Sequence, residues 1–509
     1  MRNPEHIARQ PRGDERETRL DRVIGEATAA LLDAQRDDGH WVFELEADST
    51  ISSEYIALTH FLGERDPALE ARIARYLRRR QGAHGGWPLT HGGPFNVSAS
   101  VKAYYALKLA GDAPDAPHMR RAREAILAHG GAGTANVFTR ILLALHGALR
   151  WSSVPAMPVE IMLLPGWFPF HLSRVSYWTR TVLVPLLVLQ ALRPLARNPR
   201  GVDIDELFPG GKPHARRLVR APHQARAPFA LFAVLDLVLR CAEPLVPRFV
   251  RRRAIERAVA FVEERLNGEN GLGAIFPAMA NAVMMYDTLG CPRGREPYAT
   301  ARRAVDRLLV VSGDEAYCQP CVSPVWDTAL ACQALLETAD SDAVSAAQRG
   351  LVWLAERQVL DVAGDWTSRR PDVRPGGWAF QYANPHYPDL DDTAVVVMAM
   401  DRWIRLRGAR DEHGVRDAMA RDERTLREAI ARAHEWVLGL QSRDGGWGAF
   451  DADNDNECLN HIPFADHGAL LDPPTSDVTA RCASMLAQLG VATDAPAIAR
   501  ALAFLRREQ

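Results

Sequence analysis

Apolar residues recur at spacings of three and four along much of the chain, which is the period of an amphipathic helix. The clearest stretches are residues 23–32, 97–109, 137–149, 254–266, 326–336 and 480–489. Sustained alternation of apolar and polar residues, the pattern of a half-buried strand, is scarce. The pattern therefore predicts an all-α protein, with helices layered in rings around a cavity.

A short pattern, Gln-x-x-x-Gly-x-Trp, occurs three times and has its last residue at Trp41, Trp87 and Trp447. A fourth copy with two inserted residues runs from Gln358 to Trp366, and a further Gly-Gly-Trp ends at Trp378. An apolar residue stands four positions before each Gln. The pattern predicts a helix end, then a glycine turn, then a Trp ring packed over the turn. Such self-similarity is typical of stacked helical hairpins that bury one another's apolar faces.

The last residues begin another copy of this repeat and do not finish it. Phe504, Leu505 and Gln509 match its aromatic, apolar and Gln positions, and the sequence stops before any Gly or Trp. Repeat proteins normally end in an atypical cap with a polar outer face. We therefore expect the chain to be truncated at its C-terminus.

The composition excludes several classes of protein. The 509 residues are 47% hydrophobic and 24% charged, which is ordinary for globular proteins. Because 61 Lys and Arg nearly balance 63 Asp and Glu, we expect no nucleic-acid partner. The charged N-terminus and the odd count of Cys, 7, argue against secretion and a disulfide scaffold. Cys318 and Cys321 have metal-pair spacing, but no second pair completes a zinc set, so we expect no metal.

The apolar stretch at residues 228–240 is too short to cross a bilayer, which requires about 20 apolar residues. It contains Asp236 and is bracketed by Arg226 and Arg240. Apolar segments of this length with flanking arginines are typical of a helix that lies in one leaflet. A buried core helix explains the stretch equally well.

Three carboxylates, Asp389, Asp391 and Asp392, precede the strongly apolar segment 393–400. One of them suffices to cap a helix. Carboxylates crowded at a buried site cannot all ionise cheaply, so one keeps its proton with a raised pKa. A carboxylic acid that faces a hydrocarbon is what protonation of an alkene or an epoxide requires. Two other interpretations stay open, a solvated capping cluster and a divalent metal site.

A cation formed beside such an acid would be stabilised by the faces of aromatic rings. The surrounding segments contain six candidate cavity aromatics: Trp178, Trp326, Phe380, Tyr387, Phe450 and Phe464. Any one of them is more often a core residue, but together they fit a pocket lined by rings.

With these motifs the chain resembles the squalene–hopene cyclases, the bacterial branch of the triterpene cyclases. The likeness extends from Leu20 to Gln509. Besides the Gln/Trp repeats, three segments carry it: SPVWDTALA (323–331), GGWAFQYANPHYPDLDDTA (376–394) and GGWGAFDADNDNECLNHIPFADHGALLDPPTSDVTARC (445–482).

The resemblance implies two α/α-barrel (toroid) domains. The catalytic barrel would combine residues 1–45 with residues 322–509, and residues 46–321 would form the inserted barrel. The family continues beyond Gln509 with further repeats, so the catalytic barrel is expected to be incomplete. The resemblance also implies monotopic attachment to the cytoplasmic face of the cell membrane near residues 228–240, squalene as substrate and no cofactor. It leaves a homodimer open.

The resemblance assigns the proton-donor role to Asp391. Asp389 and Asp392 would hold its geometry and acidity, and Asp477 would support it. Arg481 stands where some members have His, so a permanent cation would bond the acid cluster and sharpen the acidity of Asp391.

Other residues match the family's cavity. Trp326, Phe380 and Trp178 match wall aromatics, and Phe450 stands where some members carry Tyr. Two further acids have matching positions: Glu54 at the water-bearing end of the cavity and Asp472 near the donor.

The expected reaction is cyclisation of squalene, started by protonation of a terminal alkene. It would end with proton loss to hopene or with water capture to a hopanol. One alternative is a cyclase of oxidosqualene or of another linear isoprenoid. Another is an inactive truncated paralogue that acts as a membrane-bound helical-repeat protein.

Overall fold

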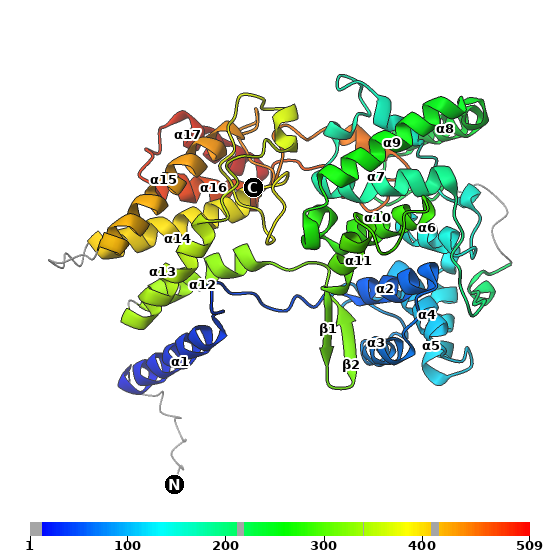
Figure 1. Cartoon of the computed structure of the whole chain (residues 1–509), viewed down its shortest axis with the longest axis horizontal. Helices are drawn as coiled ribbons and strands as arrows, with labels where there is room; N and C mark the ends of the chain where they lie inside the picture. Colours follow the sequence, from blue (N-terminus) through cyan, green and yellow to red (C-terminus); the bar gives the residue numbers. More distant parts are fainter. Residues whose placement is uncertain (1–12, 211–217, 339, 409–416) are drawn as a thin grey trace, which may run out of the picture.

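The computed structural model describes residues 13–210, 218–338, 340–408 and 417–509 (Figure 1). One group of helices comprises α2 (Ser49–Leu62), α3 (Pro67–Arg79), α4 (Val97–Ala110), α5 (Pro117–Ala128), α6 (Val137–Leu145), α7 (Tyr177–Leu192), α8 (Arg226–Ala242), α9 (Arg248–Glu264), α10 (Phe276–Thr288) and α11 (Tyr298–Asp306). The other comprises α1 (Gly13–Ala34), α12 (Pro324–Thr338), α13 (Ser341–Ala355), α14 (Leu390–Gly408), α15 (Asp417–Gly439), α16 (Ser476–Gln488) and α17 (Pro496–Glu508). Figure 1 shows the two groups side by side, with the N-terminal helix α1 beside the C-terminal half of the chain.

The all-α prediction is confirmed. Each of the six predicted stretches lies mainly in a helix, although three run past its end: α6 ends at Leu145, α9 at Glu264 and α16 at Gln488. The spacing of apolar residues did not predict the hairpin of β1 (Leu309–Ser312) and β2 (Glu315–Cys318), which is the β-structure of the described ranges apart from isolated bridges. It pairs antiparallel, from Leu309 opposite Cys318 to Ser312 opposite Glu315.

The described residues form two hydrophobic cores. The first is built from residues 51–318 and from the loop 459–471. The second combines Trp41 with residues 325–501. The loop 459–471 thus packs away from its neighbours in sequence, and Figure 1 shows this orange segment reaching across to the first group of helices. The division at residues 45 and 321 stays a prediction, and residues 1–12 lie outside the described part.

The repeat turns share one hydrogen-bond pattern, which explains why the spacing of Gln, Gly and Trp recurs. In the first copy, Gln35 Nε2 donates to the Gly39 carbonyl at 2.7 Å and to the Ala346 carbonyl at 2.9 Å. The buried Trp41 donates through Nε1 to the Leu31 carbonyl at 2.7 Å. Each turn therefore ties the end of one helix to its own glycine turn and to a second helix. The copies that end at Trp87 and Trp447 repeat these bonds.

The fourth copy ends at Trp378, so its predicted end at Trp366 is wrong. Gln358 Nε2 donates to the Gly376 carbonyl at 2.7 Å, and Trp378 Nε1 donates to the Leu354 carbonyl at 2.6 Å. Trp366 is also buried, but its indole N–H has no hydrogen-bond partner among the described residues. The insertion is therefore longer than the two residues that the spacing indicated, and it brings Trp378 beside the acidic cluster.

Candidate active site

The acidic cluster begins helix α14. The Asp389 carboxylate accepts hydrogen bonds from the backbone N–H groups of Asp391 and Asp392, at 2.7 and 3.0 Å. Its own N–H donates to the Trp378 carbonyl at 2.7 Å, which links the cap to the repeat turn. Asp389 is therefore the N-cap, and the other two carboxylates are not needed for capping.

Asp391 pairs with the cation that the sequence placed near it. Arg481 Nε, on α16, lies 3.2 Å from Asp391 Oδ1, and these side chains are 37% and 28% exposed. The Arg481 guanidinium also lies over the Trp326 ring, 5.5 Å from its centroid. Burial raises the pKa of Asp391, Arg481 opposes the shift, and the negative charge of Asp477 adds to it. The predicted donor, its arginine and one predicted aromatic thus lie together.

Asp392 is the most deeply buried acid of the cluster. It is 2% exposed, and its Oδ1 atom has no hydrogen-bond partner among the described residues. Burial raises its pKa well above the ordinary range, and the negative charges of Asp389 and Asp391 raise it further. Burial likewise raises the pKa of Asp389, to about 7. The cluster therefore holds protons at neutral pH, as crowding predicted.

The loop 449–451 lies against this cluster. The Leu390 N–H donates to the Ala449 carbonyl at 2.8 Å. The Asp472 carboxylate accepts the N–H groups of Ala449, Phe450 and Asp451 at 3.1, 2.8 and 2.7 Å. Burial and the charge of Asp451 raise the pKa of Asp472 to about 7, although those hydrogen bonds oppose the shift. The predicted acid Asp472 thus holds the backbone beside the donor motif.

Aromatic rings from both cores meet at this loop. The Tyr177 ring lies 4.2 Å from the Phe450 ring and 4.7 Å from the Tyr387 ring, between centroids. The Trp178 ring lies 5.7 Å from Phe450. Phe380 is half-buried and follows Trp378, whose carbonyl holds the cap. With Trp326 beside Arg481, five of the six predicted aromatics therefore lie around the acid motif and its neighbouring loop, by ring contacts or by sequence adjacency: Trp178, Trp326, Phe380, Tyr387 and Phe450.

A cavity of about 350 Å³ opens beside Trp178. Glu54 lies in its wall and forms an ion pair with Lys102. Most of the other lining residues are apolar side chains from α2, α6, α7 and α10. The structure therefore brings two predicted cavity residues, Trp178 and Glu54, to one hollow, and it adds a lysine that the sequence did not single out.

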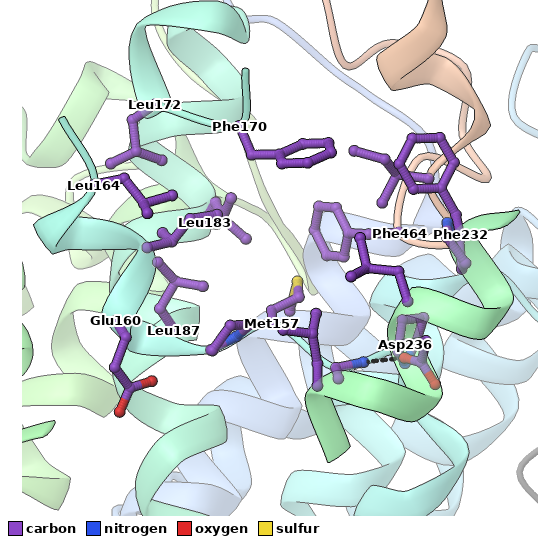
Figure 2. Close-up of a pocket in the computed structure, with 18 of the residues that line it drawn as sticks. Met157, Glu160, Leu164, Phe170, Leu172, Leu183, Leu187, Phe232, Asp236 and Phe464 are labelled. Atoms are coloured by element: carbon purple, nitrogen blue, oxygen red, sulfur yellow. Dashed lines mark hydrogen bonds between the residues drawn. The ribbon is translucent and has the colours of Figure 1, made fainter. Parts of the chain in front are cut away.

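A second cavity, of about 450 Å³, lies between α8 and the segment 155–187. Figure 2 shows the rings of Phe170, Phe232 and Phe464 gathered at one end and Glu160 and Asp236 at the other. The Phe464 ring is 5.4 Å from the ring of Phe138, which lines the first cavity. Phe464 therefore lies apart from the acid cluster, at the boundary of the two cavities.

The acids Asp389, Asp391 and Asp392 do not line either of these cavities. Asp477 is exposed, and its pKa is lowered mainly by a hydrogen bond from Thr475. In the described part of the chain, no group of three or more His, Cys, Asp or Glu side chains has a metal-binding arrangement.

Helix α8 presents two faces. Phe232 and Asp236 are buried, and the Asp236 carboxylate accepts the Ala156 N–H at 2.6 Å. Six large apolar residues of α8 and of the residues that follow it are exposed: Leu231, Val234, Leu237, Val238, Leu245 and Phe249. Every helix in the described ranges is too short or too polar to span a bilayer. The outer surface of α8 is therefore apolar without being a transmembrane span.

A buried ionic group beside the aromatic rings was missed by sequence reasoning. Arg180, 2% exposed, pairs with Asp451 and with Asp365, and Arg265 Nη2 bonds Asp365 Oδ1 at 2.7 Å. The Tyr387 hydroxyl donates to Asp365 at 2.8 Å. One signal was available, because Arg180 is a lone charge among apolar residues of α7, but its partners are distant in sequence.

Comparison with known proteins identifies the family. The squalene-hopene cyclase N-terminal domain matches residues 24–314, and the squalene-hopene cyclase C-terminal domain matches residues 322–509. The latter match extends to residue 509. The two matched domains correspond to the two groups of helices, except that the first match overlaps α1 of the second group, and they agree with two α/α toroids.

Three relatives cover almost all of this chain. A squalene–hopene cyclase of Bradyrhizobium diazoefficiens is 58% identical over 96% of this chain and 72% of its own length. A squalene–hopene cyclase of Zymomonas mobilis is 56% identical, with 96% and 72% covered. Dammaradiene synthase of Dryopteris crassirhizoma is 34% identical, with 96% and 70% covered.

Among solved structures, the ent-copalyl diphosphate synthase of Streptomyces platensis covers 95% of this chain and 92% of its own, at 16% identity and a TM-score of 0.24. That likeness is too weak to carry an argument. The family models and the relatives at 56–58% identity are strong enough, and they show that this chain belongs to the squalene–hopene cyclase family.

Proposed function

We propose that this chain cyclises squalene to hopene, with a hopanol as the product of water capture. Its membership of the family and relatives named squalene–hopene cyclase at 56–58% identity support this substrate. The observation that carries the mechanism is the cluster at the start of α14, where burial raises the pKa of three carboxylic acids and Arg481 contacts one of them.

Asp391 transfers its proton to a terminal double bond of squalene. The O–H bond breaks, the π electron pair forms the new C–H bond, and a tertiary cation remains. Each ring closure then converts one π bond into one σ bond and moves the cation along the chain. Loss of a proton gives hopene, and addition of water followed by loss of a proton gives the hopanol. A proton from solvent restores Asp391, so the reaction to hopene is a net isomerisation.

The neighbours of Asp391 fit this role. Arg481 stabilises the carboxylate that remains after proton transfer, because a charge-assisted hydrogen bond favours the ionised form. Asp392 holds its proton at neutral pH and the pKa of Asp389 is raised to about 7, so the two do not both place full negative charges beside the donor. The rings of Phe450 and Trp178 supply π faces for the moving cation.

Access from a membrane is part of the proposal. The exposed apolar surface of α8 would lie in one leaflet, and the cavity behind it would receive squalene from the lipid. The Phe464–Phe138 ring pair stands between this cavity and the one lined by Trp178. Peripheral attachment at the cytoplasmic face of the cell membrane follows from this proposal.

The alternative substrates, oxidosqualene and other linear isoprenoids, are not favoured by the relatives at high identity. An inactive helical-repeat protein on the membrane remains the second candidate, because Asp391 is partly exposed. Water that reaches the site would quench a carbocation.

The test is incubation of the purified chain with squalene in detergent, with products identified by gas chromatography–mass spectrometry. Hopene and hopanol are the expected products, with and without a chelator. Loss of turnover in the chelator would favour the metal interpretation of the acid cluster. Absence of any cyclised product from folded protein would favour the inactive candidate.

A further inference from the structure

Arg180 is a buried cation that the reaction as proposed does not use. It lies on α7, three residues after Tyr177 and two after Trp178, and the helix that follows it is mostly apolar. Its two terminal nitrogens serve different partners. Nη2 bonds Asp451 Oδ2, and Nη1 lies 3.4 Å from Asp365 Oδ2. The guanidinium therefore connects a helix of the first core to two loops from the C-terminal half of the chain.

The contact of Arg180 with Asp451, here called the Asp451 arm, reaches the loop that carries the Phe450 ring. Asp451 follows Phe450 directly, and its carboxylate is also held by Asn454 Nδ2 at 3.0 Å. Asp472 binds the backbone N–H groups of this loop from another direction. Ala449 accepts the N–H of Leu390, the residue between Asp389 and Asp391. The loop 449–451 is thus fixed at three points, and one of them is Arg180.

The same arm sets how the rings of α7 meet that loop. Tyr177 and Trp178 contact the Phe450 ring at 4.2 and 5.7 Å between centroids. Trp178 also lines the cavity that contains Glu54. Because Arg180 stands on the same helix as these rings, its bond to Asp451 holds the ring contacts in register with the acid motif.

The contact of Arg180 with Asp365, the Asp365 arm, leads to Arg265 and Tyr387. Asp365 lies in the 3₁₀ turn Asp365–Ser368 and binds Arg265 Nη2 at 2.7 Å and the Tyr387 hydroxyl at 2.8 Å. Arg265 continues to hold this carboxylate if Arg180 is lost. The two arms can therefore be separated: one positions the ring wall, and the other joins a separate buried ion pair.

We infer that Arg180 is a positioning residue for the cyclisation, which fixes the Trp178–Phe450 wall relative to the acid motif through Asp451. The inference rests on the proposed function. If the wall shifts, the cation reaches positions where no ring stabilises it and the cascade ends early. The expected consequence is a larger share of incompletely cyclised products, because a displacement of about 1 Å is enough to cost about 100-fold in a positioned reaction.

The experiment compares Arg180→Met, Arg180→Lys, Asp451→Asn and Asp365→Asn in the full chain, with squalene as the probe. Arg302→Met is the matched control, because Arg302 is also a largely buried arginine but pairs with Glu64 and Asp306 and not with the loop 449–451. Arg180→Met and Asp451→Asn should raise the ratio of incompletely to fully cyclised products about tenfold. The product ratio of Arg180→Lys should lie between those of these variants and the parent, since a single ammonium replaces a guanidinium that contacts two carboxylates through separate nitrogens.

Arg302→Met should lower thermal stability and leave that ratio unchanged. Asp365→Asn should also lower thermal stability and should change the ratio less than Asp451→Asn, because Asp365 holds Tyr387, which reaches the Phe450 ring only through Tyr177. An unchanged ratio in Arg180→Met and Asp451→Asn would overturn the inference and leave Arg180 a structural ion pair. An equal change in Asp365→Asn would overturn it too, because the effect would not follow the Asp451 arm.

A second measurement does not depend on turnover. Amide hydrogen exchange should become faster at residues 449–451 in Arg180→Met and stay as in the parent in Arg302→Met. Unchanged exchange at this loop would overturn the inference even in an inactive chain. A parent that makes no cyclised product, with faster exchange in Arg180→Met, would reject the proposed function and leave the positioning contact standing.

Discussion

Two groups of buried aspartates near the loop 449–451 differ in the number of arginines that contact them. The first group contains Asp389 and Asp392, and the second contains Asp365 and Asp451. Asp389 and Asp392 are buried together, and the cation that contacts their cluster, Arg481, pairs with Asp391 at its partly exposed edge. Asp365, by contrast, contacts two buried arginines, Arg180 and Arg265. Burial acts to raise the pKa of all these carboxyl groups. At Asp365 the two arginines outweigh burial, so the pKa of Asp365 is lowered, whereas the pKa values of Asp389 and Asp392 are raised.

The difference shows that burial does not decide the charge of a carboxylate in this fold; the number of adjacent cations does. One group keeps protons and is suited to donate them. In the other, two arginines lower the pKa of Asp365, while the pKa of Asp451, which pairs with Arg180, stays raised by burial. The contributions of Asp389 and Asp365 to stability therefore have opposite dependence on pH.

Replacing the donor should have the largest effect. Asp391→Asn keeps the shape of the side chain and removes the acidic proton, so squalene turnover should fall at least about 100-fold. The circular dichroism spectrum should remain that of the parent, because the Asp391 side chain is partly exposed and pairs with Arg481, which is also partly exposed. The measurement is hopene formed per hour by gas chromatography–mass spectrometry.

The control for this change is Asp314→Asn, in the exposed turn between β1 and β2, which should keep full turnover. Turnover that survives in Asp391→Asn and disappears in Asp392→Asn would transfer the donor role to the buried acid of the cluster.

Removing an arginine from the second group should cost the most stability. Arg265→Met leaves Asp365 with Arg180 as its remaining arginine and removes the hydrogen bond to the Tyr387 hydroxyl. Loss of one partner of a buried ion pair lowers the free energy of unfolding by about 3–5 kcal/mol. Urea unfolding measures it. Arg252→Met, an exposed arginine of α9 with a surface partner, should change it by about 1 kcal/mol or less.

The two groups were not equally visible in the sequence. Asp389, Asp391 and Asp392 lie within four residues in front of an apolar run, so a local pattern predicts both the helix start and the excess acid. Arg180 and Asp451 are 271 residues apart, and their contact depends on how the two cores pack. A lone arginine in an apolar helix predicts a buried partner and does not identify it.

The repeats show a similar limit. Three copies have fixed spacing, so their turns could be predicted from the sequence. In the fourth, either Trp366 or Trp378 could be the Trp that closes the repeat turn. The structure shows that it is Trp378, because its indole N–H donates to the Leu354 carbonyl. Phe464 was grouped with the other cavity aromatics, yet its loop packs into the first core, beside the cavity behind α8. Long-range packing, which has no local signature, determines both outcomes.

The pH dependence of stability separates the two groups more finely. The pKa of Asp389 is raised from 3.8 to about 7, so the folded state binds more protons than the unfolded state over this interval, and stability falls as the pH rises through it. Asp389→Asn keeps an N-cap of similar strength and removes this titration. Its melting temperature should therefore decline less than that of the parent between about pH 4 and about pH 7.

Asp365→Asn provides the opposite reference. The pKa of Asp365 is lowered, so its contribution is present at neutral pH and is lost only as the pH falls through the folded-state value. This variant should lose stability at neutral pH and approach the parent in acid. A parallel decline of Asp389→Asn and the parent would mean that Asp389 is ionised throughout and that the contrast between the groups is wrong.

The smallest effect should come from Arg481, which contacts the acid cluster at Asp391. Arg481 opposes the rise in the pKa of Asp391, so Arg481→Gln should let Asp391 keep its proton to higher pH. Since activity requires the protonated acid, the alkaline limb of the kcat profile should move to higher pH, while the maximal rate falls because the acid is weaker. Arg427→Gln, on the exposed surface of α15, should leave the limb in place. If the limb also stays in place in Arg481→Gln, the ionisation that limits turnover does not belong to Asp391, and Asp392, which is buried out of contact with that guanidinium, becomes the group to test.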